Sequence, residues 1–140
     1  MAKVSLTKDL NVDQNQLFQA IVDYEKYPEF ISEIKSAKVI SENPKRVQFT
    51  LELMKTFDYV LEFKETTPTD VSWKLVESNL FKKNSGGWKI KKKGDKISAT
   101  YSLDVEFGFL APSFIVNKMV KKDLPKMIQQ FEDRVKELHE

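Results

Sequence analysis

The chain has 140 residues, 41% of them apolar, and its 23 basic and 21 acidic residues leave a net charge of only +2. This balance excludes a disordered chain, and the absence of cysteine excludes disulfides and thiolate metal sites. One domain over residues 1–140 is expected for this length. The most apolar window, 105–116, is too short to cross a bilayer, and the first ten residues lack an apolar core of signal-peptide length. We therefore expect a cytoplasmic protein.

Two short helices are predicted to follow a first strand near the N-terminus. Alternating apolar residues indicate the strand around residues 4–6. Asp13 is a candidate helix cap, and the apolar stripe after it ends around residue 23. The second helix is expected over 27–33, because proline, here Pro28, is tolerated in a first helical turn.

From there to residue 107 the apolar period is two, which is typical of antiparallel strands with one buried and one solvent-facing side. The clearest segment is 97–107, where apolar and polar residues alternate throughout. Six strands are predicted in this part of the chain. Turns are expected at Asn43-Pro44, Thr67-Pro68, Ser85-Gly86-Gly87 and Gly94-Asp95.

A long C-terminal helix is predicted to begin at Ser113. Its apolar residues are spaced by three and four and form one stripe. Pro125 interrupts the helix and Asp123 can cap a second segment, so a kink is expected near Lys122. The element order is β-α-α-β-β-β-β-β-β-α. It indicates an α+β fold with one curved, seven-stranded antiparallel sheet and one dominant helix.

The geometry of this fold predicts a cavity. Seven strands at a spacing of about 4.8 Å make a sheet roughly 30 Å wide, whereas a helix is about 10 Å across. The sheet must therefore curl around the helix, and large side chains or a ligand must fill the remaining space. Either the inward aromatic rings simply fill the core, or they bind an apolar ligand. The predicted ligand-binding residues are Phe49, Phe57, Tyr59, Phe63, Trp73, Trp88, Tyr101 and Phe107 from the sheet, and Met119, Met127 and Ile128 from the helix.

Residues 107–112 join the last strand to the long helix, at one end of the predicted cavity. This connection is interpreted either as a structural lid or as a gate for the ligand. The predicted gate residues are Phe109, Leu110 and Pro125, because the irregularity at Pro125 would let the helix shift.

A second feature is a basic segment, 82–96, which carries seven lysines against one acidic residue. We define the lysine surface as Lys82, Lys83, Lys89, Lys91 and Lys93. One interpretation is a solvated outer face whose lysines discourage strand pairing with other chains. The alternative is a docking surface for an anionic membrane or for RNA. The aromatic interleaving of a nucleic-acid platform is missing, so the sequence favours RNA or the ribosome less.

Few residues suit catalysis. The one histidine, His139, is next to last in the chain, and no acidic cluster or phosphate-binding loop is apparent, so no metal or cofactor is expected. The inward positions of the predicted strands contain no Asp or Glu. Acid–base chemistry would therefore depend on Tyr59 or Tyr101, which also offer polar handles to a ligand. A cyclase that mainly folds a reactive chain in a shaped pocket remains an alternative.

Residues 23–30 carry an Asp-x-x-x-Tyr-Pro-x-Phe motif, and further agreement lies at 71–75, 86–88, 100–103 and 124–134. This pattern resembles the polyketide cyclase/dehydrase and coenzyme Q-binding branch of the START-like (SRPBCC) superfamily over nearly the whole chain. The resemblance implies a helix-grip (Bet v 1/START-like) fold, with a seven-stranded sheet around the C-terminal helix and a hydrophobic cavity. Relatives bind lipids, isoprenoid quinones, sterols or polyketides. A few are aromatase/cyclases, and one bacterial branch is described as a ribosome-association toxin.

The leading hypothesis is a carrier, chaperone or sensor that binds a lipid, isoprenoid quinone or polyketide-like molecule without an enzymatic reaction. An aromatase/cyclase-like enzyme is the first alternative. A ribosome- or membrane-associated interaction protein is the second. The sequence leaves the ligand's identity and the oligomeric state open.

Overall fold

The computed structural model describes residues 2–53, 55–108 and 113–139, and within them the predicted element order is confirmed. The strands are β1 (Ala2–Leu10), β2 (Ile34–Glu42), β3 (Lys45–Leu53), β4 (Lys55–Thr66), β5 (Asp70–Ser78), β6 (Phe81–Lys93) and β7 (Lys96–Phe107). The helices are α1 (Gln14–Val22), the 3-10 helix η1 (Tyr24–Glu29), α2 (Ser113–Lys118), the π-helix η2 (Met119–Asp123) and α3 (Leu124–Leu138).

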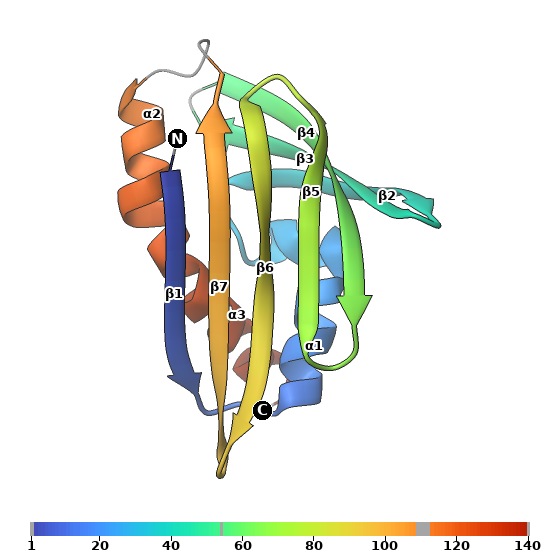
Figure 1. Ribbon diagram of the computed structural model, residues 1–140, viewed down its shortest axis with the longest axis vertical. Coiled ribbons are helices and arrows are strands. Elements are labelled where there is room, and N and C mark those ends of the chain that lie inside the picture. Colours follow the sequence, from blue (N-terminus) through green and yellow to red (C-terminus); the bar gives the residue numbers. More distant parts are fainter. Residues whose placement is uncertain (1, 54, 109–112, 140) are drawn as a thin grey trace.

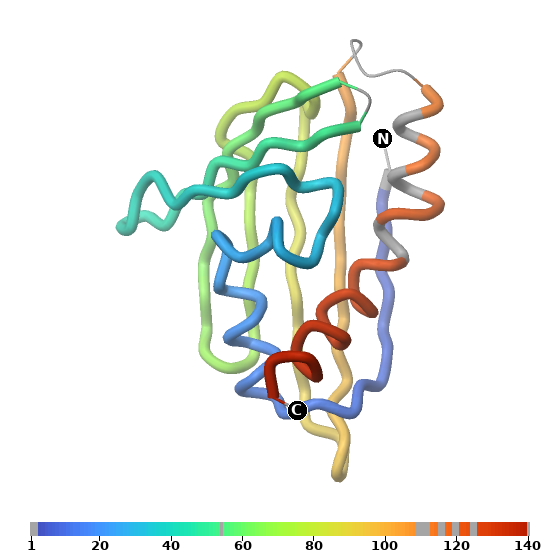
Figure 2. Tube along the Cα trace, turned by 180° about the vertical axis from the view of Figure 1, so that it is seen from behind, coloured from blue at the N-terminus to red at the C-terminus, as the bar shows by residue number. Residues whose placement is uncertain are grey.

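The strands form one antiparallel sheet in the order β1-β7-β6-β5-β4-β3-β2. The first strand therefore pairs with the last, with Leu6 opposite Tyr101. The sheet curves around α3, which crosses one of its faces together with α1 and η1 (Figures 1 and 2). The α+β helix-grip architecture expected from the sequence is confirmed.

The N-terminal helices follow the expected capping chemistry, with one correction. Asp13 caps α1, because its Oδ2 accepts a hydrogen bond from the Gln16 amide at 3.1 Å. The second helix, however, runs from Tyr24 to Glu29 instead of over 27–33. It begins early because Tyr24 is buried, with its ring 4.2 Å from that of Phe63 and its hydroxyl donating to Glu65 at 2.8 Å.

The Tyr-Pro-x-Phe motif has a packing role. Tyr27 stacks on Phe49 and donates its hydroxyl to the carbonyl of Ile21, while the ring of Phe131 lies edge-on to both Tyr27 and Phe30. The motif therefore fixes η1 between the sheet and α3.

The expected turn at Ser85-Gly86-Gly87 is wrong, because these residues lie within β6. The glycines allow the backbone of the neighbouring strands, and at Gly86 also the Trp73 ring, to approach closely, and they do not reverse the chain. A Cβ on Gly86 would lie 2.2 Å from the Ser102 carbonyl oxygen and 2.9 Å from the ring of Trp73. The β5–β6 turn instead falls at Asn79 and Leu80. The other three predicted turns are confirmed, and Gly94 takes the positive φ, +63°, that favours glycine.

The break predicted near Lys122 is confirmed as the π-helix η2, which joins α2 to α3. Asp123 takes the N-cap position of α3, but its side chain makes no capping hydrogen bond. Pro125 lies in the first turn of α3, where proline is tolerated. From there α3 buries Ile128, Phe131 and Val135 against the core.

Candidate ligand cavity

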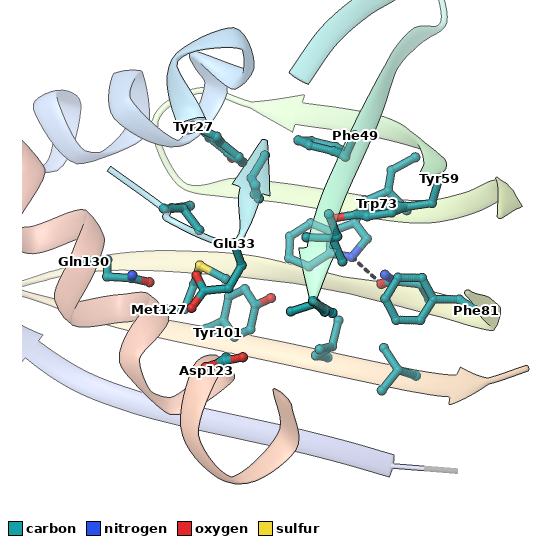
Figure 3. A pocket seen from close by; sticks show the side chains of 18 of the residues that line it. Tyr27, Glu33, Phe49, Tyr59, Trp73, Phe81, Tyr101, Asp123, Met127 and Gln130 are labelled. Atoms are coloured by element: carbon teal, nitrogen blue, oxygen red, sulfur yellow. Dashed lines mark hydrogen bonds between the residues drawn. The ribbon is translucent and has the colours of Figure 1, made fainter. Parts of the chain in front are cut away.

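A cavity of about 110 Å³ lies between the concave face of the sheet and α3 (Figure 3). Strands β3 to β7 form its floor. Residues of η1, the start of β2, the end of η2 and α3 enclose it from the opposite side. Its lining is mainly apolar and aromatic, which is the composition typical of small-molecule sites. The volume is below the roughly 300–1,000 Å³ of pockets for drug-sized ligands. It is closer to the roughly 150 Å³ of an engineered apolar cavity that accepts benzene.

Most of the predicted ligand-binding residues line this cavity: Phe49, Tyr59, Phe63, Trp73, Trp88, Tyr101, Phe107 and Met127. Phe57 and Ile128 are buried in the core and are not among the lining residues. The helical residues that line the cavity are Asp123, Met127, Gln130 and Phe131. Ile128 is turned about 100° away from Met127. The side chains of Met119 and Pro125, and all of Phe109 and Leu110, lie outside the described residues.

Two tyrosines supply neutral polar groups. The Tyr59 and Tyr101 hydroxyls point toward the interior of the cavity in Figure 3. Burial raises the pKa of both groups above the ordinary value of 10, so each remains protonated at neutral pH. Neither hydroxyl has a hydrogen-bond partner among the described residues, and each can therefore donate to or accept from a ligand.

Asn84 was missed by the sequence reasoning. It is buried, lines the cavity, and its Oδ1 accepts a hydrogen bond from the Trp73 Nε1 at 3.1 Å. The signal that could have found it was a polar residue at an inward position of β6. This signal was hidden because the neighbouring glycines were assigned to a turn.

Two carboxylates line the cavity from outside the strands, so acid–base chemistry does not depend on Tyr59 and Tyr101 alone. Glu33, just before β2, and Asp123, at the end of η2, both line the cavity. Asp123 is only 8% exposed. Burial, and secondly the negative charge of Glu33, raise the pKa of the Asp123 carboxyl above its ordinary value. The sequence prediction assumes about 3.6 residues per turn throughout the helix. The π turn before α3 has a different number of residues per turn, so it rotates Asp123 to a side of the helix that the prediction does not give.

The lysine surface lies away from this cavity. All five of its lysines are exposed, whereas Trp88 between them is buried on the other side of β6. Lys83 pairs with Asp104 at 2.8 Å and Lys93 with Asp9 at 3.1 Å. In the described part of the chain, the remaining three have no carboxylate within 4 Å.

The described residues contain no group of three or more His, Asp or Glu side chains placed to hold a metal ion. None of their helices has the length and apolar character needed to cross a membrane.

Two bacterial proteins are similar to this chain in sequence over nearly its whole length. The chain is 23% identical over 143 residues to the persistence and stress-resistance toxin PasT of Escherichia coli, covering 99% of this chain and 90% of the relative. It is 22% identical, with the same coverage, to the ribosome association toxin RatA of Escherichia coli.

Solved structures share the fold of this chain. A START superfamily protein from Mycobacterium smegmatis superposes with a TM-score of 0.83 at 21% identity, over 97% of this chain and 98% of the other. The Zhui aromatase/cyclase of a Streptomyces species superposes with a TM-score of 0.83 at 8% identity, over 96% of this chain and 93% of the other. Residues 10–132 match the model of a family described as polyketide cyclase / dehydrase and lipid transport. With its seven-stranded sheet wrapped around α3, the chain belongs to this family, within the START-like (SRPBCC) superfamily.

Proposed function

We propose that the chain binds a hydrophobic small molecule in the cavity beneath α3 and acts as a cytoplasmic carrier, chaperone or sensor of it. The observation that carries this proposal is the set of inward aromatic rings around a mainly apolar cavity. Each 100 Å² of apolar ligand surface removed from water contributes about 2.5 kcal/mol to binding before ordering costs. The family's description as including lipid transport supports the same function.

The size of the cavity limits how a lipid or isoprenoid quinone binds. A volume of about 110 Å³ accepts a single ring or a short chain segment. A longer ligand therefore requires α3 to move away from the sheet, and the π-helix η2 is the irregular point at which it can move. In this proposal Phe109, Leu110 and Pro125 form the gate through which such a ligand enters.

The experiment uses the protein's own fluorescence. Both tryptophans of the chain line the cavity, so their emission reports its occupancy directly. Titration with a panel of quinones and fatty acids is expected to change the emission and raise the melting temperature. Mass spectrometry of protein extracted from its host under native conditions is expected to find a bound apolar molecule. The proposal fails if the extracted protein is empty and no compound in the panel changes either signal.

A cavity-filling variant is the matched test. Leu103→Phe places a larger side chain into the lining from β7, and it is expected to weaken binding of every ligand. Lys91→Glu, on the exposed side of the sheet, is expected to leave binding unchanged. Equal affinities in both variants would place the ligand outside this cavity.

An aromatase/cyclase-like enzyme is the second candidate. Two tyrosine hydroxyls and the Asp123 carboxyl, whose pKa burial raises, line one cavity and could exchange protons with a poly-β-ketone chain. Product formation from such a substrate is expected to fall in Tyr59→Phe, Tyr101→Phe or Asp123→Asn. Unchanged turnover in all three variants would remove these residues from the reaction.

Docking of the lysine surface onto an anionic membrane or a ribosome is the third candidate. The similarity to the ribosome association toxin RatA and the exposure of all five lysines favour it. Lys91→Glu plus Lys93→Glu is expected to reduce co-sedimentation with anionic vesicles or ribosomes, and added salt should do the same. The control is Lys38→Glu plus Lys64→Glu, which changes exposed lysines elsewhere. Binding that is insensitive to salt and to the first pair contradicts this candidate.

A further inference from the structure

One carboxylate at the cavity wall has unused capacity for hydrogen bonds. Asp123 is 8% exposed, and within the described residues neither of its oxygens has a hydrogen-bond partner. Its nearest cations, the Nζ atoms of Lys118 and Lys126, lie at 3.8 and 4.0 Å, beyond hydrogen-bond distance. Both lysine side chains are more than half exposed and so remain largely hydrated. A buried carboxylate in this state is costly unless a donor reaches it.

The surroundings of Asp123 give the cavity a polar end. Glu33, from the segment before β2, lines the same part of the cavity, together with Met127 of α3 and Tyr101 of β7 (Figure 3). Glu33 is close enough for its negative charge to raise the pKa of the Asp123 carboxyl. By contrast, the Oδ1 of Asn84 already accepts a hydrogen bond from the Trp73 Nε1. The unused acceptors therefore lie at the α3 end of a space that is otherwise apolar.

We propose that this acidic end of the cavity, made by Asp123 and Glu33, receives the protonated amine of an apolar ligand. An ammonium group carries only donors, so it can satisfy Asp123 while its apolar body lies among the aromatic rings. A carboxylate or phosphate head group is repelled by the same pair of side chains. This inference rests on the proposed function, and it narrows the ligand class to hydrophobic amines.

The test compares four probes of one ring each: toluene, benzylamine, benzyl alcohol and benzoate. Titrations at pH 7, followed by tryptophan emission and melting temperature, are expected to rank benzylamine first and benzoate last. A charge-assisted hydrogen bond predicts that benzylamine binds about tenfold or more tightly than toluene. Benzyl alcohol is expected to lie between the two, because its hydrogen bond to the carboxylate lacks the opposite charge.

The variants locate the effect. Asp123→Asn is expected to reduce benzylamine affinity about tenfold and to leave toluene affinity unchanged. Glu33→Gln is expected to reduce benzylamine affinity by a smaller factor. Asp133→Asn is the control, because it removes an exposed carboxylate from the same helix, and it should bind all four probes like the parent chain.

The outcomes separate this inference from the proposed function. If toluene binds but benzylamine binds no more tightly, or if benzoate or benzyl alcohol equals benzylamine, the acidic end does not select amines, and the proposed function stands. An unchanged benzylamine preference in both Asp123→Asn and Glu33→Gln also overturns the inference. If none of the four probes binds, the cavity does not take apolar ligands of this size, and both proposals lose their support.

Discussion

Phe131 is the residue on which closure of the cavity by α3 most depends. It is 1% exposed, lines the cavity, and packs edge-on against Tyr27, Phe30 and Trp88 with ring centroids 5.0–5.4 Å apart. Phe131→Ala removes the ring and these three contacts together. A buried Phe→Ala change of this kind costs about 4 kcal/mol of unfolding free energy.

Urea denaturation measures this loss. With a slope of about 1.5 kcal/mol per molar, the midpoint is expected to fall by more than about 2 M. Phe114→Ala is the matched control, because Phe114 is 56% exposed on α2, and it should cost less than about 0.5 kcal/mol. Toluene at a hundred times its dissociation constant should restore about 2.7 kcal/mol to Phe131→Ala by occupying the enlarged cavity.

The result that would refute this reasoning is a small effect. A loss below about 1 kcal/mol for Phe131→Ala, with an unchanged slope, would mean that α3 does not contribute the packing described here. Failure of toluene to stabilise the variant would mean that the enlarged space does not stay apolar.

Two further predictions concern Gly86 and Asp123. Gly86→Ala should cost about 1–3 kcal/mol in the same denaturation assay, because its Cβ meets backbone at 2.2 Å, whereas Gly108→Ala, with its nearest neighbour at 3.4 Å, should be nearly neutral. Burial raises the pKa of Asp123 in the folded state, so its ionised form destabilises the fold above that pKa. Asp123→Asn is therefore expected to raise the unfolding free energy at pH 7, and this gain should disappear as the pH falls below the ordinary value of 3.8. A gain that grows toward acid pH would contradict this sign.

The order of the elements could be predicted from the sequence, because apolar periods of two and of three to four report directly which side of a strand or helix is buried. The same periods do not report position along a buried face. For this reason Phe57 and Phe49 look alike in the sequence, yet only Phe49 lines the cavity. Ile128 was misplaced similarly, since it shares the buried stripe of α3 and faces away from the cavity.

The parts of the site that were missed depend on contacts between distant residues. Gly86 resembles a turn residue until the ring of Trp73, thirteen positions earlier, is seen against it. Asp123 resembles a helix cap until the π turn brings it to the cavity wall. In both cases the local sequence preference was read correctly, but contacts with residues distant in the sequence determined the role of the residue.

The pairing of β1 with β7 has a consequence for how the protein acquires its shape. Ala2 lies opposite Val105 and Leu10 opposite Ile97, so the sheet is completed only by contacts between its first and last strands in the sequence. Such long-range pairing is slow to form, with folding times of milliseconds to seconds typical of folds of this kind. During synthesis all the strands that carry the aromatic floor leave the ribosome before α3 does, because they precede it in the sequence. A chain that stops before residue 113 would therefore expose that floor to water, and aggregation of such fragments is the hazard that this topology carries.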